Sequence, residues 1–278
     1  MKRIATIQDI SCLGKCSLTV ALPLISAMGS EACVIPTAVL STHTMFSGFT
    51  FRDLTDDMPD IAAHWEKEGF RFDALYTGYL GSQRQLDIVA DYFDRFGTSA
   101  LKIVDPAMAD NGKLYSGFTP EFALLMGKLC GKADIILPNL TEAAYLLGER
   151  YMQPGSYTED DIKGLLRRLA ALGPKYAVLT GGSFAPDKIG VMSYCAETDS
   201  FDCYFHSKVN AAYHGTGDIF ASVVTGALMR DFTLSEALRI AADYTADCIR
   251  LTAETPNGIT YGVYFEALIP KLLDLLKP

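Results

Sequence analysis

The sequence lacks any long apolar run. No run of roughly 18 apolar, uncharged residues, the length of a membrane-spanning helix, occurs along the chain. Residues 1–10 carry two basic side chains but lack the apolar stretch of about 7 to 15 residues that marks a secretory signal. These absences argue against a membrane protein and predict a cytoplasmic one.

Paired cysteines are also missing. The chain has 7 cysteines, an odd number, and none stands in a C-x-x-C motif or in a Cys/His spacing typical of zinc sites. Cys12 and Cys16 are the closest pair in sequence. We therefore expect free thiols, as in a reducing compartment, rather than a disulfide framework.

Basic side chains are scarce relative to acidic ones. The 24 Lys and Arg residues are outnumbered by 33 Asp and Glu residues, which leaves a formal net charge of −9. This charge opposes general attraction to nucleic acid or anionic lipid. We expect small-molecule partners, with no nucleic acid and no membrane, and a polyanionic ligand would need a local positive field or a bound cation.

The composition and the pattern of apolar residues indicate a globular α/β protein. Apolar residues make up 49% of the chain and charged residues 21%. Short apolar or β-branched runs alternate with segments of helical period, as in parallel sheets whose strands are joined by helices. We expect strands over residues 4–7, 33–40, 74–77, 101–104, 135–137 and 177–180, and helices over residues 14–28, 58–68, 82–96, 120–130, 141–147 and 159–172.

The alternation changes after residue 180. Residues 189–195 and 201–206 flank a turn-like segment and predict an antiparallel hairpin; helices over 215–229 and 234–251 and an amphipathic stretch over 264–275 follow. No linker, low-complexity tract or repeat interrupts the series. We predict one α/β domain over residues 1–278, a three-layer sandwich with a mostly parallel central sheet flanked by helices. Residues 46–57 are expected to form a lid or an edge insertion.

Candidate site residues follow the predicted strands, because ligands of open α/β sheets bind beyond the carboxyl ends of the strands. These positions are polar, acidic or glycine-bearing in every case, although a purely structural sheet would also end in such turns. They are Gln8 and Asp9, residues 41–44 with His43 and Thr44, residues 78–81 with Tyr79, Asp105 with Pro106, residues 138–142 with Asn139 and Glu142, and residues 181–183 with Gly182.

The sharpest motif is the run Gly215, Thr216, Gly217 and Asp218, which leads into a helical apolar pattern. Its two glycines let the backbone approach a ligand closely, and the amides at the helix start form an anion hole. Asp218 in the first turn can take a proton from an attacking alcohol. Interpreted structurally, the same residues are a tight turn and a favourable first-turn acid.

Two common phosphate-binding motifs are absent. The Gly-Lys pairs that begin at residues 14, 112, 127 and 131 lack both the upstream glycine spacing and the following Ser or Thr of a Walker A motif. Phe220 occupies the position of the third glycine of G-x-G-x-x-G. If this chain binds phosphate, it must do so through a different arrangement of residues.

Asn139 and Glu142 begin a predicted helix directly after a strand. An Asn at the N-cap with Glu three residues later is a capping-box variant, so the pair has a structural explanation. The functional interpretation places Glu142 and Asp105, both at strand carboxyl ends, near a Mg2+ ion or its waters. Mg2+ prefers oxygen ligands and keeps much of its hydration shell.

Together these residues resemble a known family. Residues 215–218, 139–142, 105–106, 41–44 and the Gly-Tyr-Leu-Gly of residues 78–81 are similar to motifs of the ribokinase-like superfamily, specifically its pyridoxal kinase branch. The resemblance covers essentially the whole chain. It implies the ribokinase-like fold, a homodimer, and ATP- and Mg2+-dependent phosphorylation of the 5′-hydroxymethyl group of pyridoxal, pyridoxamine or pyridoxine.

The resemblance also implies site residues, in a reaction that needs positioning and charge stabilisation more than covalent chemistry. Asp218 looks like the general base, beside an anion hole of the Gly215, Thr216 and Gly217 amides, and His43, Thr44 and Tyr79 look like contacts to the pyridine ring. The nucleotide side comprises Asp105, Asn139 and Glu142 as magnesium and phosphate ligands or their water-bridging partners, Thr180 and Gly182 as nucleotide contacts, and Tyr115 as a cover over the phosphates.

One residue departs from the resemblance. Many members of the branch carry Ser where this chain has Asp9, an anion that would face the substrate ring. It could pair with a pyridinium or an amine, which would shift preference among vitamers or toward the aminopyrimidine alcohol of the related hydroxymethylpyrimidine kinases of thiamine synthesis. Those kinases often have Cys in place of Asp218, so Asp218 favours the pyridoxal side.

Three alternatives stay open. The first is a hydroxymethylpyrimidine kinase or a bifunctional enzyme. The second is a non-catalytic vitamer-binding protein, against which the intact run from Gly215 to Asp218 argues. The third is a generic sugar kinase, which His43 and Thr44 disfavour because they suit a flat heteroaromatic ring.

Overall fold

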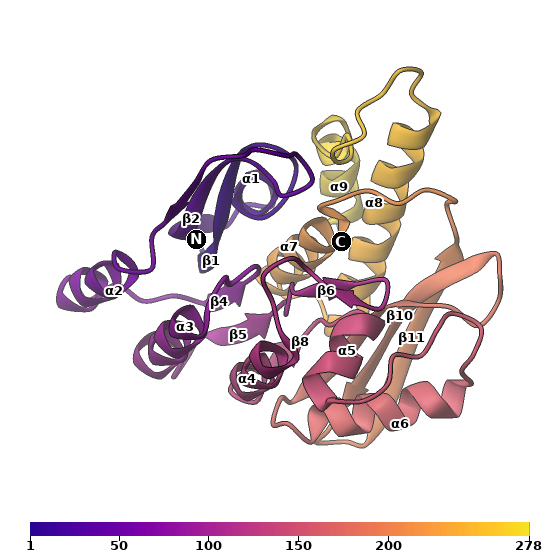
Figure 1. The fold of residues 1–278 in the computed structure, drawn as a ribbon, viewed down its shortest axis with the longest axis horizontal. Helices are drawn as coiled ribbons and strands as arrows, with labels where there is room; N and C mark the ends of the chain where they lie inside the picture. Colours follow the sequence, from indigo (N-terminus) through magenta and orange to yellow (C-terminus); the bar gives the residue numbers. More distant parts are fainter. Residues whose placement is uncertain (278) are drawn as a thin grey trace. The chain divides into compact units, whose positions relative to one another are not determined.

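The structure is a computed structural model that describes residues 1–277, and the chain divides into two compact units. The first unit comprises Met1–Gly78 and the described residues from Val209 onward, and the second comprises Tyr79–Lys208. In each unit helices lie against a set of strands (Figure 1). The predicted α/β class with mostly parallel strands flanked by helices is confirmed.

The strands of the first unit have the order β4-β1-β2-β3. β1 is parallel to β4 and β2, and β3 adds an antiparallel edge. Helix α1 packs on β1 and β2 and against α7, which packs on α8. The elements are β1 (Arg3–Leu13), α1 (Leu18–Ala27), β2 (Glu31–Thr42), β3 (Phe51–Asp53), α2 (Met58–Lys67), β4 (Ala74–Thr77), α7 (Thr216–Leu228), α8 (Leu234–Glu254), the 3-10 helix η1 (Glu266–Leu268) and α9 (Ile269–Leu275).

The strands of the second unit have the order β11-β10-β9-β8-β5. β5, β8 and β9 are parallel, whereas β10 is antiparallel to β9 and to β11, so the predicted hairpin is confirmed. Helix α6 packs on β9 and β10. The elements are α3 (Gln83–Phe96), β5 (Leu101–Val104), β6 (Ala109–Asp110), β7 (Lys113–Leu114), α4 (Pro120–Cys130), β8 (Ile135–Ile136), α5 (Leu140–Leu147), α6 (Glu159–Ala170), β9 (Tyr176–Gly182), β10 (Lys188–Cys195) and β11 (Ser200–Ser207).

Local sequence explains where several helices begin. Ser82 and Thr119 accept backbone N–H groups at the starts of α3 and α4, and Thr158 and Thr233 form capping boxes at the starts of α6 and α8. The cores are apolar; Ile4, Ile7, Leu24 and Ile35 in the first unit and Ile103, Ile136, Leu166 and Val178 in the second are fully buried.

Two sequence predictions need correction. The helix expected from residue 14 begins only at Leu18, because Gly14 has φ +149° and Ser17 has φ +51°, neither of which is helical. The first strand does not end at residue 7 but continues to Leu13, with a register shift against β2 between Gln8 and Ile10. Asp9 therefore lies at a β irregularity within the strand rather than beyond its end.

Other predictions concern the loop at residues 46–57, the thiols and the membrane. That loop contains β3, so the edge interpretation is confirmed, while closure as a lid stays a prediction. All seven cysteines are free thiols, as expected. No helix within residues 1–277 is long and apolar enough to span a membrane.

Candidate active site

The start of α7 presents the amides of the predicted anion hole. Gly215 is the N-cap residue, with φ +79°, and no side chain caps the amides of the first turn. A Cβ at Gly215 would overlap the carbonyl oxygen of Lys15, whereas a Cβ at Gly217 would meet no atom within 4 Å. The left-handed backbone and the close approach of Lys15 therefore both require glycine at position 215.

Asp218 has the properties of a base that works near neutral pH. Burial raises the pKa of its carboxyl to about 7, and the negative charge of Asp9 adds to the increase. The backbone N–H of Ser17 donates a hydrogen bond to the carboxylate and partly offsets the rise in pKa. A carboxylate with a pKa near 7 accepts a proton more readily than an ordinary one and can still ionise near neutral pH.

Asp9 is a second buried acid beside Asp218. It is 5% exposed, and the Ser11 hydroxyl donates to its Oδ2 at 3.3 Å. Burial raises its pKa. Burial, together with the charges of Asp218 and Asp9, also raises the pKa of the Cys16 thiol to about 12. The surroundings of Asp9 therefore favour a ligand that brings a positive charge or an N–H donor.

The His43 ring lies in a cluster of aromatic side chains. Its Nδ1 accepts the backbone N–H of Met45 at 3.2 Å, so Nε2 carries the proton and donates to the Tyr261 carbonyl at 2.8 Å. The rings of Phe46 and His214 lie 5.1 and 5.4 Å away. Both nitrogens of His43 are engaged within the protein, so only the ring surface remains for a substrate. Thr44, beside it, is exposed.

In the second unit, Asn139 and Glu142 form the predicted capping box at the start of α5. The Asn139 Oδ1 accepts the N–H groups of Thr141 and Glu142 at 2.8 and 2.9 Å. Glu142 accepts the Asn139 N–H at Oε2 and the Met108 N–H at Oε1, at 2.9 and 3.2 Å. Burial raises the pKa of Glu142 to about 8 in spite of these bonds.

Asp105 follows β5, and both Asp105 and Glu142 lie close enough to Cys130 to affect its thiol. Asp105 is 7% exposed, and the charges of both carboxylates help to raise the pKa of the buried Cys130 thiol, after burial itself. Among residues 1–277 no three His, Cys, Asp or Glu side chains are grouped to hold a metal. Two carboxylates and a nucleotide's phosphates are a common Mg2+ environment. Both carboxylate oxygens of Glu142 already accept backbone N–H groups, so Glu142 suits contact with a Mg2+ ion through a metal-bound water.

Thr180 lies beside the capping box, on the same strand as Gly182. Thr180 forms a parallel bridge with Asn139, and its N–H donates to the Pro138 carbonyl at 3.0 Å. Gly182 is buried at the end of β9. Tyr115 is 43% exposed, and the ring of Tyr79 lies 5.4 Å from that of Phe118.

The structure thus brings the predicted residues into two groups, one in each unit. Asp9, His43, Thr44 and residues 215–218 belong to the first unit, and Asp105, Asn139, Glu142 and Thr180 to the second. Two further residues, Ser17 and Tyr261, were not predicted; they contact Asp218 and His43 through backbone groups. No side-chain pattern signals a contact made by the backbone.

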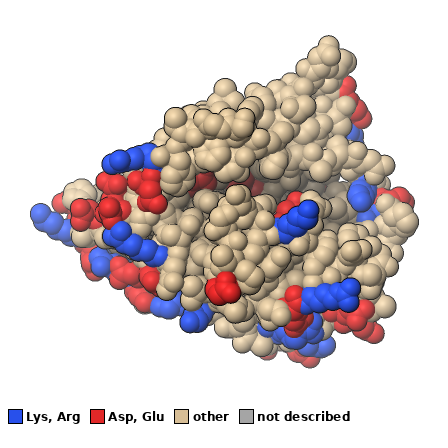
Figure 2. Space-filling model, viewed as in Figure 1, with Lys and Arg blue, Asp and Glu red and all other residues tan. Residues whose placement is uncertain are grey.

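Charged side chains on the surface pair with each other. Figure 2 shows Lys and Arg side chains standing among Asp and Glu side chains on the face drawn. Ion pairs in the second unit include Lys132 with Asp94, Arg168 with Glu149 and Lys175 with Glu197, each at 2.7 Å. Cations that already have acidic partners contribute little to anion binding, whereas the amides at the start of α7 have no side-chain cap.

Comparison with known proteins gives the family of the chain. The sequence profile of the phosphomethylpyrimidine kinase family matches residues 22–262. The chain belongs to this family. The phosphomethylpyrimidine kinase family is part of the ribokinase-like superfamily, so the predicted superfamily is confirmed. Membership of a kinase family implies a phosphotransferase that uses ATP.

Three relatives illustrate the range of the phosphomethylpyrimidine kinase family. A structure from Bacteroides thetaiotaomicron, named as a phosphomethylpyrimidine kinase and crystallised with pyridoxal, is 41% identical with a TM-score of 0.92, over 98% of this chain and 95% of that one. Lactobacillus plantarum pyridoxal kinase is 32% identical with a TM-score of 0.90, over 99% and 98%. The Bacillus subtilis hydroxymethylpyrimidine/phosphomethylpyrimidine kinase is 27% identical over 69% of this chain and 68% of its own length.

Proposed function

We propose that this chain is a B6-vitamer kinase, which transfers the γ-phosphoryl group of ATP to the 5′-hydroxymethyl group of pyridoxal, pyridoxamine or pyridoxine. The observation that carries the proposal is Asp218, a carboxyl with a pKa of about 7 at the uncapped start of α7. Relatives that are a pyridoxal kinase or were crystallised with pyridoxal support the vitamer as acceptor.

The proposed proton transfer runs from substrate to Asp218. As the hydroxymethyl oxygen attacks the γ-phosphorus, its proton passes to the Asp218 carboxylate, and the bond from that phosphorus to the bridging oxygen of ADP breaks. The amides of Gly215, Thr216 and Gly217 would stabilise the charge on the transferring group, because they lack side-chain caps and point out of the positive end of the helix.

The proposed ring contacts start from Asp9. Its buried carboxylate would accept a hydrogen bond from a protonated ring nitrogen or an amino group, which suits the acidic surroundings of β1. His43 would contribute ring surface, since both of its nitrogens are engaged. Thr44 and, in the second unit, Tyr79 remain proposed contacts to the pyridine ring.

The proposed nucleotide side lies in the second unit. Asp105, Asn139 and Glu142 would hold Mg2+ or its waters, Thr180 and Gly182 would contact the nucleotide, and Tyr115 would cover the phosphates. When bound, Mg2+ would neutralise phosphate charge, which suits a protein with a net charge of −9.

A second candidate is the phosphorylation of hydroxymethylpyrimidine, alone or together with B6 vitamers. The family match and the Bacillus subtilis relative favour it. Asp9 fits it as well, because an aminopyrimidine offers an N–H donor to a buried carboxylate. We prefer a B6 vitamer as the acceptor because the structure crystallised with pyridoxal and the pyridoxal kinase are 41% and 32% identical to this chain, whereas the Bacillus subtilis relative is 27% identical.

Steady-state kinetics separate these functions. Purified protein is incubated with ATP, Mg2+ and either pyridoxal, pyridoxamine, pyridoxine or hydroxymethylpyrimidine, and the phosphate ester is identified by mass spectrometry. We expect the highest kcat/KM for a B6 vitamer. A higher value for the pyrimidine would establish the second candidate, and failure to consume ATP with any acceptor would favour a non-catalytic vitamer-binding protein.

A cytoplasmic location and a homodimer are likewise proposed for this chain.

A further inference from the structure

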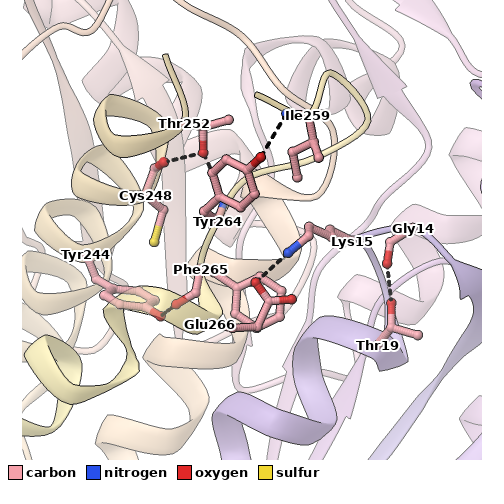
Figure 3. Close-up of polar contacts among 10 residues, drawn as sticks. All are labelled: Gly14, Lys15, Thr19, Tyr244, Cys248, Thr252, Ile259, Tyr264, Phe265 and Glu266. Carbon is pink, nitrogen blue, oxygen red and sulfur yellow. Dashed lines mark hydrogen bonds and ion pairs between the residues drawn. The ribbon is translucent and has the colours of Figure 1, made fainter. Parts of the chain in front are cut away.

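Lys15 is held by the segment near the C-terminus (Figure 3). Its ammonium group forms an ion pair with Glu266 and lies 5.6 and 5.1 Å from the ring centres of Tyr264 and Phe265. The Lys15 side chain is only 14% exposed. A cation shielded from water in this way interacts more strongly with a carboxylate and with aromatic rings than an exposed one does.

The partners of Lys15 are themselves fixed to α8, as Figure 3 shows. The buried Tyr244 hydroxyl donates to the Phe265 carbonyl at 2.7 Å. The Tyr264 N–H donates to the Thr252 hydroxyl at 2.9 Å, and that hydroxyl donates to the Cys248 carbonyl at 2.8 Å. We call residues 259–266 the brace. Its contacts make it a firm support for Lys15.

The brace also contacts His43, a candidate site residue of the first unit, and the stem of Lys15. The Tyr261 carbonyl accepts the Nε2 proton of His43. Gly262 lies against the Lys15 stem, because a Cβ there would be 2.5 Å from the Lys15 Cβ. The brace therefore contacts both His43 and Lys15, so a shift of the brace would displace both residues.

The loop at residues 14–17, which contains Lys15, also contacts Asp218, the candidate base. The Ser17 N–H donates to the Asp218 carboxylate, and the Lys15 carbonyl lies against Gly215. Ser17 has φ +51° and ψ −132°, a conformation that non-glycine residues rarely adopt. Such a conformation persists only where surrounding contacts hold it.

We propose that Lys15 is a positioning residue for Asp218, whose ion pair with Glu266 holds the loop at residues 14–17 so that the Ser17 N–H stays on the Asp218 carboxylate. Its catalytic consequence rests on the proposed function. The hydrogen bond stabilises the ionised form of Asp218 against burial and against the charge of Asp9 on β1. Cys16, in the same loop, also lies close enough to respond to Asp218.

The test uses Lys15→Met, which keeps the apolar stem and removes the charge, and Glu266→Gln, which removes the other partner. Lys15→Arg retains the charge and is the conservative variant. Lys277→Met is the matched control, because it breaks an exposed ion pair with Asp274 in the same unit. Two readouts need no turnover: the titration of the Asp218 carboxyl followed by carbon-13 NMR, and hydrogen exchange of the Ser17 amide.

We expect faster exchange at Ser17 and a higher Asp218 pKa in both Lys15→Met and Glu266→Gln, with Lys15→Arg and Lys277→Met close to the unaltered protein. In a vitamer kinase, kcat should fall about tenfold or more with little change in the KM for ATP. Unchanged titration and exchange in both variants would overturn the positioning role. If the unaltered protein phosphorylates no acceptor, the proposed function fails, while titration and exchange still decide the role of Lys15.

Discussion

The pKa of Asp218 at the start of α7 is raised by burial and, beyond that, by the negative charge of Asp9 on β1. Replacing Asp9 by Asn removes that charge, so the pKa of Asp218 should drop below about 7. Since the base must be ionised to accept a proton, the acidic limb of the kcat/KM profile should move to lower pH. Asp274→Asn, at an exposed site of the same unit, should leave the limb in place. A limb that stays put or moves upward in Asp9→Asn would contradict the coupling.

Gly215 and Gly217 offer a matched pair of substitutions at the start of α7. Gly215→Ala places a Cβ on the Lys15 carbonyl at a residue with φ +79°, so it should destabilise the fold by about 2 to 3 kcal/mol. Gly217→Ala meets no atom within 4 Å and should change stability by no more than about 1 kcal/mol. Urea denaturation measures both. Equal effects of the two substitutions would count against the tight contact with Lys15.

His43 should be a neutral ring with its proton on Nε2. The Met45 N–H occupies Nδ1, and the Tyr261 carbonyl accepts the proton of Nε2. Long-range proton–nitrogen NMR spectra of the ring distinguish the two tautomers. They should show the Nε2–H form before and after addition of pyridoxal, whereas a change of tautomer on binding would show that a ring nitrogen contacts the substrate.

Glu142 should make stability depend on pH. Its folded pKa of about 8 lies above the ordinary value of 4.5, so the folded state binds more protons between these two pH values. The contribution of the buried carboxyl is therefore complete below about pH 4.5 and is lost as pH rises toward 8.

Glu142→Gln removes this titration and should flatten the decline in unfolding free energy between pH 5 and pH 8, although it also loses one acceptor of the capping box. Glu197→Gln, at an exposed ion pair in the same unit, is the control. Unfolding in urea at several pH values gives the slopes. A slope as steep in Glu142→Gln as in the unaltered protein would rule out Glu142 as its source.

Much of the fold could be predicted because apolar periodicity reports directly on burial. The helix at residues 120–130 and the strands at 74–77 and 101–104 match the structure to the residue. β3 escaped prediction because all three of its residues are exposed, so no apolar pattern marks it. The predicted start of α1 was wrong because Gly14 and Ser17 have backbone angles that are not helical. Such angles depend on contacts with distant parts of the chain, which a local pattern does not report.

The residues of the candidate site could likewise be predicted only in part. Residues 215–218 and the pair Asn139 and Glu142 could be recognised because short motifs carry their chemistry. The Lys15 and Glu266 pair could not, since its partners are 251 positions apart and the contact exists only after folding. The engagement of both His43 nitrogens was equally hidden, because its partners are backbone groups.

The central claim is that Asp218 accepts the proton of a B6 vitamer's hydroxymethyl group. Asp218→Asn keeps the size of the side chain and removes the base, so kcat for pyridoxal with ATP and Mg2+ should fall by roughly 10²- to 10⁴-fold, with the KM for ATP little changed. Circular dichroism confirms that the variant is folded. A folded Asp218→Asn protein that phosphorylates pyridoxal with the unaltered kcat would contradict the account.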